Sequence, residues 1–140
     1  MAEPFRVRLV VRGYELDGRG VLAGAGYHQY GEHARAECLR TAGVSVPTME
    51  TAGITLVTLE TTVRFRRDLR DGDEVTVSCA FAWRPGKTFR IDQEIRRRDR
   101  TVAAELTSLA GLLDIAERKL VADPAARLRV IAHDPASLGL

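Results

Sequence analysis

Apolar and polar residues alternate along the first patterned segment, residues 5–11 (FRVRLVV), where arginines separate the apolar positions. This period of two predicts a half-buried strand. Residues 13–26 follow and contain five glycines. Such a density of glycine excludes a long regular element and predicts a turn and a loop whose backbone comes close to another group.

The spacing of apolar residues becomes helical at Tyr27. Over residues 27–42, small or apolar side chains recur at the spacing of one face of a helix of about four turns. They are Tyr27, Tyr30, Gly31, Ala34 and Cys38, and the opposite face carries Gln29, Glu32, His33 and Arg40. Gly43 is placed as a C-terminal cap, and Pro47 prevents continuation. Because Gly31 and Ala34 are small, a sheet is expected to approach this face closely.

Sheet is predicted for the remainder of the chain. The expected strands cover residues 54–67, 74–83, 88–98 and 101–115, with a short edge at 119–121 and a tail that is irregular or weakly helical at 125–131. Strands joined in sequence by short turns, with one flanking helix, predict an α+β fold. The helix covers one face of the sheet. The other face is expected to be covered by a second copy, in a homodimer or homotetramer.

The composition narrows the class of protein. A chain of 140 residues, 45% hydrophobic and 29% charged and without repeats or linkers, predicts a single soluble domain, with its core at about 5–121. No apolar run approaches the roughly 20 residues of a membrane span, and no basic and apolar leader opens the chain. Cys38 and Cys79 predict free buried thiols, hence a cytoplasmic location. A net charge of +2 does not favour a nucleic-acid partner.

Arginine dominates the basic residues, because only Lys87 and Lys119 of the 21 are lysines. A GC-rich coding sequence explains such a bias, and so does bidentate phosphate binding. Two groups flank the predicted strand ends: Arg64, Arg66, Arg67 and Arg70, and Arg96, Arg97, Arg98 and Arg100. They predict either a solvated edge that discourages aggregation or a surface that binds phosphate groups or an acidic partner.

Residues 11–43 resemble the signature segment of hotdog-fold thioesterases of the 4-hydroxybenzoyl-CoA thioesterase type. The shared features are Tyr14, Asp17, the loop Gly18–Gly26, Tyr27, Tyr30, Glu32 and the pair Ala34-Arg35. Residues 53–77 resemble the central strand of that family, and the likeness extends over about 5–121. It implies a single hotdog fold, an antiparallel sheet of about five to six strands wrapped around one long central helix.

The resemblance also implies an activity, hydrolysis of an acyl-CoA or acyl-carrier-protein thioester without cofactor or metal. Asp17 would act as nucleophile or general base, and N–H groups near Gly24, Gly26 and Tyr27 would hold the oxyanion. Tyr27 and Arg35 would orient the substrate. Glu32 is a further candidate acid, because a second class of hotdog thioesterases places its carboxylate on the central helix.

The residues by themselves leave plainer interpretations open. Asp17 in a Leu-Asp-Gly sequence is typical of a turn, and Tyr27 fits a core aromatic position. Arg35 fits a structural pair with Glu32 or Asp17. The histidines lack metal-ligand spacing, so no metal is expected, and Cys38 lacks a partner for catalysis.

The sequence departs from the family at Gly24 and Gly26, where members commonly carry His and Asn. It is also similar to thioesterases of enediyne polyketide pathways, which favours bacterial secondary metabolism and release of a polyketide or aromatic acyl chain. The lost side chains make a non-catalytic acyl-thioester binding module the alternative. Dehydration on the same fold is a third option, but its His-containing hydratase motif is absent from the sequence.

Overall fold

The computed structural model describes residues 4–140. Its elements, in chain order, are β1 (Phe5–Val10), the 3-10 turn η1 (Gly13–Glu15), α1 (Gly24–Thr41), α2 (Val46–Thr51), β2 (Ile54–Phe65), β3 (Glu74–Ala82), β4 (Thr88–Arg97), β5 (Val102–Asp114), β6 (Lys119–Leu120), α3 (Pro124–Ile131) and η2 (Pro135–Leu138).

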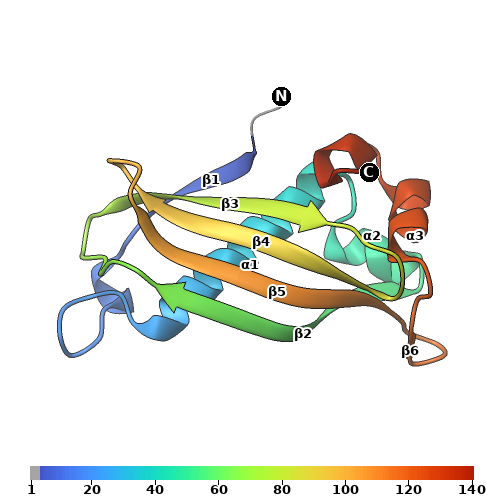
Figure 1. Cartoon of the computed structure of the whole chain (residues 1–140), viewed down its shortest axis with the longest axis horizontal. Helices are drawn as coiled ribbons and strands as arrows, with labels where there is room; N and C mark the ends of the chain where they lie inside the picture. Colours follow the sequence, from blue (N-terminus) through green and yellow to red (C-terminus); the bar gives the residue numbers. More distant parts are fainter. Residues whose placement is uncertain (1–3) are drawn as a thin grey trace.

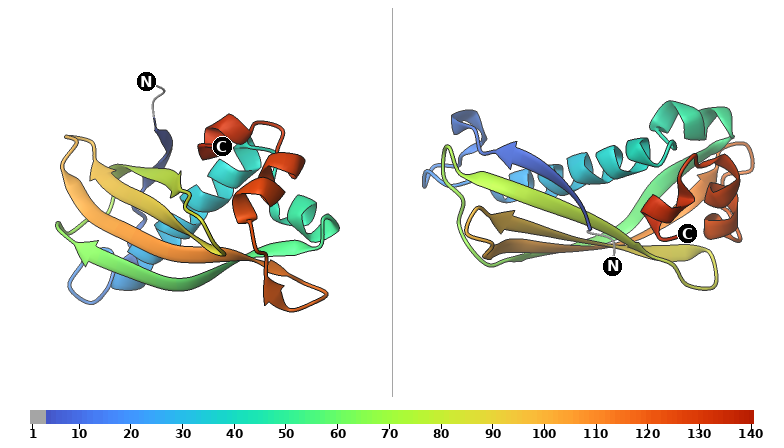
Figure 2. Two further views of the ribbon diagram at one scale, coloured as in Figure 1. Left: turned by 45° about the vertical axis from the view of Figure 1, so that its right-hand side comes forward. Right: turned by 90° about the horizontal axis from the view of Figure 1, so that it is seen from above.

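One antiparallel sheet contains all the strands, in the order β1-β3-β4-β5-β2, with β6 paired to the end of β5. The long helix α1 lies along one face of this curved sheet (Figures 1 and 2). The predicted α+β class is therefore confirmed, and the arrangement of one long helix against a curved sheet is that of a hotdog fold.

The contact between α1 and the sheet depends on small residues, as the sequence predicts. The predicted apolar face of the helix is buried throughout. A Cβ at Gly31 would lie 2.8 Å from Leu106 Cδ2 and 3.2 Å from Gln93 Oε1, so only glycine allows this approach. The buried Gln93 amide donates to the Gly31 carbonyl at 2.8 Å. It thereby ties the helix to the centre of the sheet.

Three details of the prediction are wrong. Strand β2 does not pair with β3, which follows it in sequence; it pairs with β5 at the far edge. The pairing of β2 with β5 shifts register at a bulge near Leu59. The helix α1 begins three residues before Tyr27, at Gly24, and α2 is a second helix where only sheet is predicted, with Pro47 in its first turn.

The outer face of the sheet carries polar and charged side chains along β4. Along β4 the buried side chains face α1, and Arg90, Asp92, Glu94 and Arg96 alternate with them. This face therefore tolerates water. In the part of the chain that the structure describes, no helix is long and apolar enough to cross a membrane.

Candidate active site

The loop that carries Asp17 closes on itself just before α1. Leu16 and Leu22 form an isolated antiparallel bridge, and the Asp17 N–H donates to the Val21 carbonyl at 2.8 Å. The Leu22 N–H in turn donates to the carbonyl of Leu69 at 2.7 Å. These backbone bonds fix the loop between the start of the helix and the connection from β2 to β3.

Asp17 itself forms a local turn. Its Oδ1 accepts the N–H of Arg19 at 2.8 Å, and its Oδ2 lies 3.6 Å from the Arg19 guanidinium. The side chain remains 34% exposed, so one edge of the carboxylate meets solvent. Arg19 also lies 3.9 Å from Asp68. Asp17 therefore forms the turn that its Leu-Asp-Gly sequence suggests, and its carboxylate remains partly exposed.

The start of α1 presents unsatisfied donors. Ala23 is the N-cap and supplies no side-chain cap. The Gly26 N–H donates to the Ala23 carbonyl at 2.8 Å. Within residues 4–140, the N–H groups of Gly24 and Ala25 meet no acceptor, and they lie at the positive end of the helix dipole. The free donors thus include the expected Gly24 and lie two residues before the other expected positions, Gly26 and Tyr27.

Gly26 has a packing role instead. A Cβ at this position would lie 2.5 Å from Cδ1 of Leu22, whose side chain is buried in the core. At Gly24 a Cβ would lie 3.7 Å from the Phe65 ring, which is ordinary contact. Of the two glycines, only Gly26 is required by close approach.

Tyr27 joins the helix start to the end of β2. Its hydroxyl donates to the Arg67 carbonyl at 3.0 Å, and its ring packs edge-on against Phe65 with centroids 5.1 Å apart. Burial, and next the Asp68 carboxylate, raise the pKa of Tyr27 above its usual value. Phe65 is 58% exposed. The Tyr27 hydroxyl is thus bonded to the backbone, while the exposed ring of Phe65 lies beside the free N–H groups at the start of α1.

Glu15 and Tyr30 form a pair that the sequence reasoning missed. The Tyr30 hydroxyl donates to Glu15 Oε1 at 2.6 Å, and the N–H of Arg12 donates to the same oxygen at 3.0 Å. Burial and then this bond to Glu15 raise the pKa of Tyr30 strongly. The available signal was an acid four residues after the expected strand and two residues before Asp17. The pair fastens η1 to α1.

Arg35 and Glu32 lie away from the helix start. Arg35 is 11 residues beyond Gly24, about 16 Å along the axis at 1.5 Å per residue. Its guanidinium donates to Thr58 Oγ1 on β2 at 3.1 Å, so it pairs with neither Glu32 nor Asp17. Glu32 is exposed and forms a 2.6 Å pair with His28 Nε2. The structure therefore does not bring Asp17, Arg35 and Glu32 together within one chain.

Other reactive side chains near α1 are structural. Cys38 and Cys79 are buried, and their mutual hydrogen bond, with burial, raises the pKa of Cys79. A buried thiol held protonated is a poor nucleophile. Among residues 4–140, no group of three or more His, Cys, Asp or Glu side chains is arranged to hold a metal ion.

Comparisons with known proteins agree with the fold. The chain is 39% identical over 79 residues to the chloroplastic acyl-acyl carrier protein thioesterase ATL3 of Arabidopsis thaliana, an alignment of 56% of this chain and 42% of that protein. The chain thus spans less than half of that relative.

Two solved structures share the whole arrangement. A 1,4-dihydroxy-2-naphthoyl-CoA thioesterase from Synechocystis superposes with a TM-score of 0.81 at 19% identity, over 92% of this chain and 95% of that one. A Staphylococcus aureus protein solved in complex with CoA gives a TM-score of 0.83 at 20% identity, over 91% and 80%. At such identities the likeness concerns the fold. The family model of the thioesterase-like superfamily matches residues 11–131, most of the chain, and the protein belongs to this superfamily.

Proposed function

We propose that this protein hydrolyses an acyl thioester, carried by CoA or by an acyl carrier protein, to the free acid. The observation that carries the proposal is the pair of free N–H groups at Gly24 and Ala25, directly after the loop that exposes the Asp17 carboxylate. Membership of the thioesterase-like superfamily supports the reaction class. Oriented N–H groups at a helix start stabilise the oxyanion that forms when a thioester carbonyl is attacked.

Asp17 has two possible roles in this reaction. As a nucleophile it attacks the acyl carbon, the C–S bond breaks, the thiolate leaves and takes a proton, and water then hydrolyses the mixed anhydride. As a general base it removes a proton from the attacking water. Turnover in H₂¹⁸O separates these routes. Attack of water on an anhydride at its Asp17 carbonyl leaves label in Asp17, whereas the general-base route labels only the released acid.

The proposal is tested on a panel of acyl-CoAs, with the released thiol measured by a colorimetric reagent. Asp17→Asn and Asp17→Ala are expected to lower kcat by at least about a hundredfold, as loss of a base or nucleophile does. Asp68→Asn is the matched control, because Asp68 is an exposed carboxylate that contacts the same Arg19. Full hydrolytic rates in both Asp17 variants would refute the role of Asp17.

We propose that the site is completed by a second copy joined at the β2 edge. In the described residues β2 pairs with β5 alone and leaves the other edge of a 12-residue strand open. Leu59 and Phe65 on that strand are exposed. A long apolar edge favours pairing with another strand. The acyl chain would then enter between helix and sheet at the interface, where Arg35, bonded to Thr58 of β2, is expected to contact it.

Tyr27 enters the proposal as a positioning residue. Its hydroxyl holds the Arg67 carbonyl, and its ring holds Phe65 beside the helix start. Tyr27→Phe is expected to raise KM more than it lowers kcat, because Phe keeps the ring and loses only the anchor. A polyketide or aromatic acyl chain is the substrate that we propose first, and such chains as simple N-acetylcysteamine thioesters belong in the panel.

A second candidate function is a non-catalytic module that binds acyl thioesters. It is favoured because candidate catalytic side chains already form hydrogen bonds within the protein. Asp17 already accepts the Arg19 N–H, and Tyr27 already donates to Arg67. Glycines stand at positions 24 and 26 in place of polar side chains. Binding of the acyl-CoA panel, measured by calorimetry without thiol release, would support the binding module over the hydrolase.

A further inference from the structure

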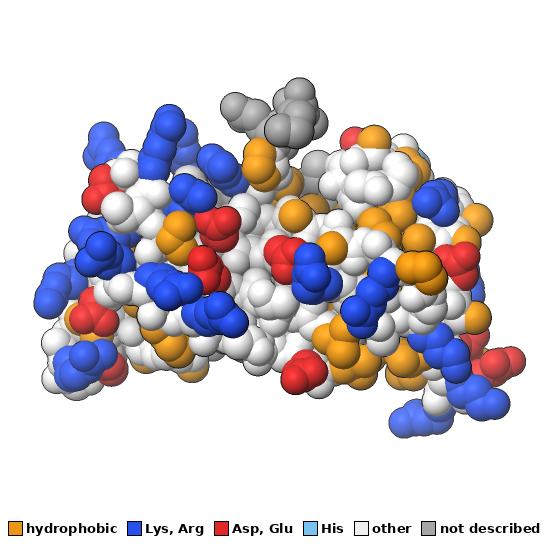
Figure 3. Space-filling view, viewed as in Figure 1, with side chains coloured by type: hydrophobic (Ala, Val, Ile, Leu, Met, Phe, Trp, Pro, Cys, Tyr) orange, Lys and Arg blue, Asp and Glu red, His pale blue; other side chains and the backbone are white. Residues whose placement is uncertain are grey.

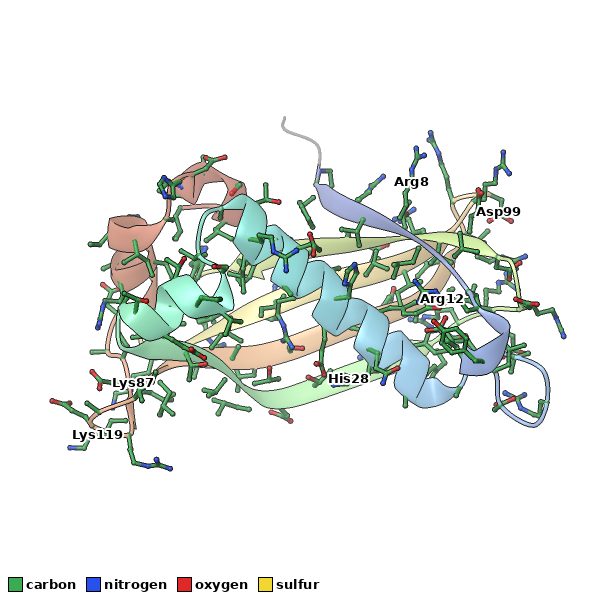
Figure 4. The ribbon with its side chains drawn as sticks, turned by 180° about the vertical axis from the view of Figure 1, so that it is seen from behind. Arg8, Arg12, His28, Lys87, Asp99 and Lys119 are labelled. Carbon is green, nitrogen blue, oxygen red and sulfur yellow. The ribbon has the colours of Figure 1, made fainter. Side chains whose placement is uncertain are left out.

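A groove lined by arginines lies on the sheet away from the candidate active site. It has a volume of about 740 Å³, and its basic lining is Arg6, Arg8, Arg96, Arg97, Arg98 and Arg100. These residues come from β1, from the end of β4 and from the turn into β5. Figure 3 shows basic side chains gathered over this end, and Figure 4 shows Arg8 and Asp99 at one end with Lys87 and Lys119 at the other.

Most of this positive charge is not neutralised by the protein. Among the described residues, Glu74 is the one acidic residue that lines the groove. Arg98 lies 3.5 Å from Glu74, and Arg96 lies 2.8 Å from Glu94. In the part of the chain that the structure describes, the other four arginines of the groove form no ion pair within 4 Å. The net charge of the whole chain is only +2, so the charge is concentrated here.

The register of the strands sets the shape of the groove. Thr76 pairs with Arg8 on one side and with Arg96 on the other. With strands about 4.8 Å apart, the two arginines are separated by about 10 Å across the small Thr76. An α-helix with side chains is about 10–12 Å wide. A helix therefore fits over Thr76 with a guanidinium on each flank.

The spacing of the arginines along β1 also matches an α-helix. Arg6 and Arg8 lie on one face of the strand, about 6.8 Å apart at 3.4 Å per residue. Acidic residues at i and i+4 of a helix rise by about 6 Å. By contrast, the groove lining within residues 4–140 includes no aromatic side chain to hold an adenine ring. The geometry favours carboxylates on a helix over the phosphates of a nucleotide.

The β4–β5 turn carries Arg100 at a cost in stability. Its φ is +72°, a conformation that favours glycine, and Arg96 donates to its carbonyl at 3.1 Å. Arg118, in the β5–β6 turn at the other end of the sheet, has a φ of +58°. Replacing either arginine by glycine removes one positive charge and relieves the strain of a positive φ, so the two variants form a matched pair.

We propose that this arginine groove docks an acidic helix of the acyl carrier protein that delivers the thioester, so that the carrier protein rather than CoA is the preferred thiol carrier. The inference rests on the proposed function only for the identity of the cargo. The groove is on the face of the sheet opposite to α1, because the exposed Arg6 and Arg8 alternate along β1 with Val7 and Leu9, which pack against the core that α1 covers.

The test measures binding rather than turnover. The probes are a panel of acyl carrier proteins that hold an acyl chain through a non-hydrolysable amide, together with CoA and a 20-nucleotide DNA. Arg6→Glu/Arg8→Glu is expected to raise the Kd for the carrier proteins at least about tenfold at 50 mM salt. Lys87→Glu/Lys119→Glu changes the net charge by the same amount at the opposite end and is expected to leave Kd unchanged.

The turn variants separate docking from folding. Arg100→Gly and Arg118→Gly are each expected to raise Tm by about 3 °C, because glycine relieves the positive φ. Only Arg100→Gly is expected to weaken carrier-protein binding, by about threefold. Weaker binding in a more stable protein excludes unfolding as its cause.

Several results would overturn the proposal. These are the absence of binding to every carrier protein, equal binding by the two double variants, an equal loss of CoA affinity in Arg6→Glu/Arg8→Glu, and tighter binding to DNA. The proposed function fails separately. If acyl-CoA, N-acetylcysteamine and acyl-carrier-protein thioesters are all left unhydrolysed while groove-dependent docking persists, the hydrolase proposal is wrong and the docking surface stands.

Discussion

Replacement of Tyr30 by Phe removes one hydroxyl from the joint between η1 and α1. Tyr30 is 3% exposed, and its hydroxyl donates to the carboxylate of Glu15, which is 14% exposed, at 2.6 Å. Hydrogen bonds to charged groups contribute roughly 1.5–3 kcal/mol. Glu15 keeps the N–H of Arg12 and, at 3.7 Å, its guanidinium. We therefore expect a loss of about 2 kcal/mol in the free energy of unfolding.

Urea unfolding measures this loss directly. At a slope of about 2 kcal/mol/M, the midpoint falls by about 1 M. Tyr14→Phe is the matched control, since Tyr14 is 82% exposed and its loss is expected to be under about 0.5 kcal/mol. With Glu15→Gln, a double-mutant cycle should give a coupling of at least about 1 kcal/mol. Equal midpoints for the Tyr30 and Tyr14 variants would refute the argument.

Further predictions concern pH and packing. Burial raises the pKa values of Tyr27 and Tyr30 in the folded protein. The contribution of the two protonated hydroxyls to the free energy of unfolding is therefore complete below about pH 10, the pKa of an unfolded tyrosine, and it is lost as the pH rises through the folded pKa. The urea midpoint of the wild-type protein should therefore decrease as the pH rises above 10, and that of Tyr30→Phe should decrease less steeply. The same pH dependence in both proteins would contradict this prediction. Gly26→Ala places a Cβ 2.5 Å from Leu22 and should destabilise by about 1 kcal/mol, whereas Gly24→Ala should not destabilise; equal melting temperatures would exclude the packing argument.

The central helix was predictable because its period is regular and its small residues are informative. The buried face from Tyr27 to Cys38 and the close approach at Gly31 follow from sequence alone. The start of α1 was not predictable in the same way. Gly24 and Gly26 suggest a loop by propensity, but packing of Leu22 under Gly26 overrides that preference.

Pairing and side-chain partners depend on distant parts of the chain. The position of β2 at the far edge follows from its long-range pairing with β5, and short turns suggested the wrong neighbour. The sequence predicts that Asp17 lies in a turn or loop. Its capture by Arg19, and the bond between Glu15 and Tyr30, require the loop to be closed in space.

The most direct test of the proposed thioesterase site removes one N–H from the start of α1. Gly24 is the first helical residue, and Ala23 before it has φ −61° and ψ 147°, a conformation compatible with a following proline. Gly24→Pro deletes the N–H with the helix intact, and Gly24→Ala keeps it. Loss of one oxyanion donor predicts a fall in kcat for thioester hydrolysis of about 10²–10³ in Gly24→Pro relative to Gly24→Ala, at equal Tm. Equal kcat values in the two folded variants would contradict the account.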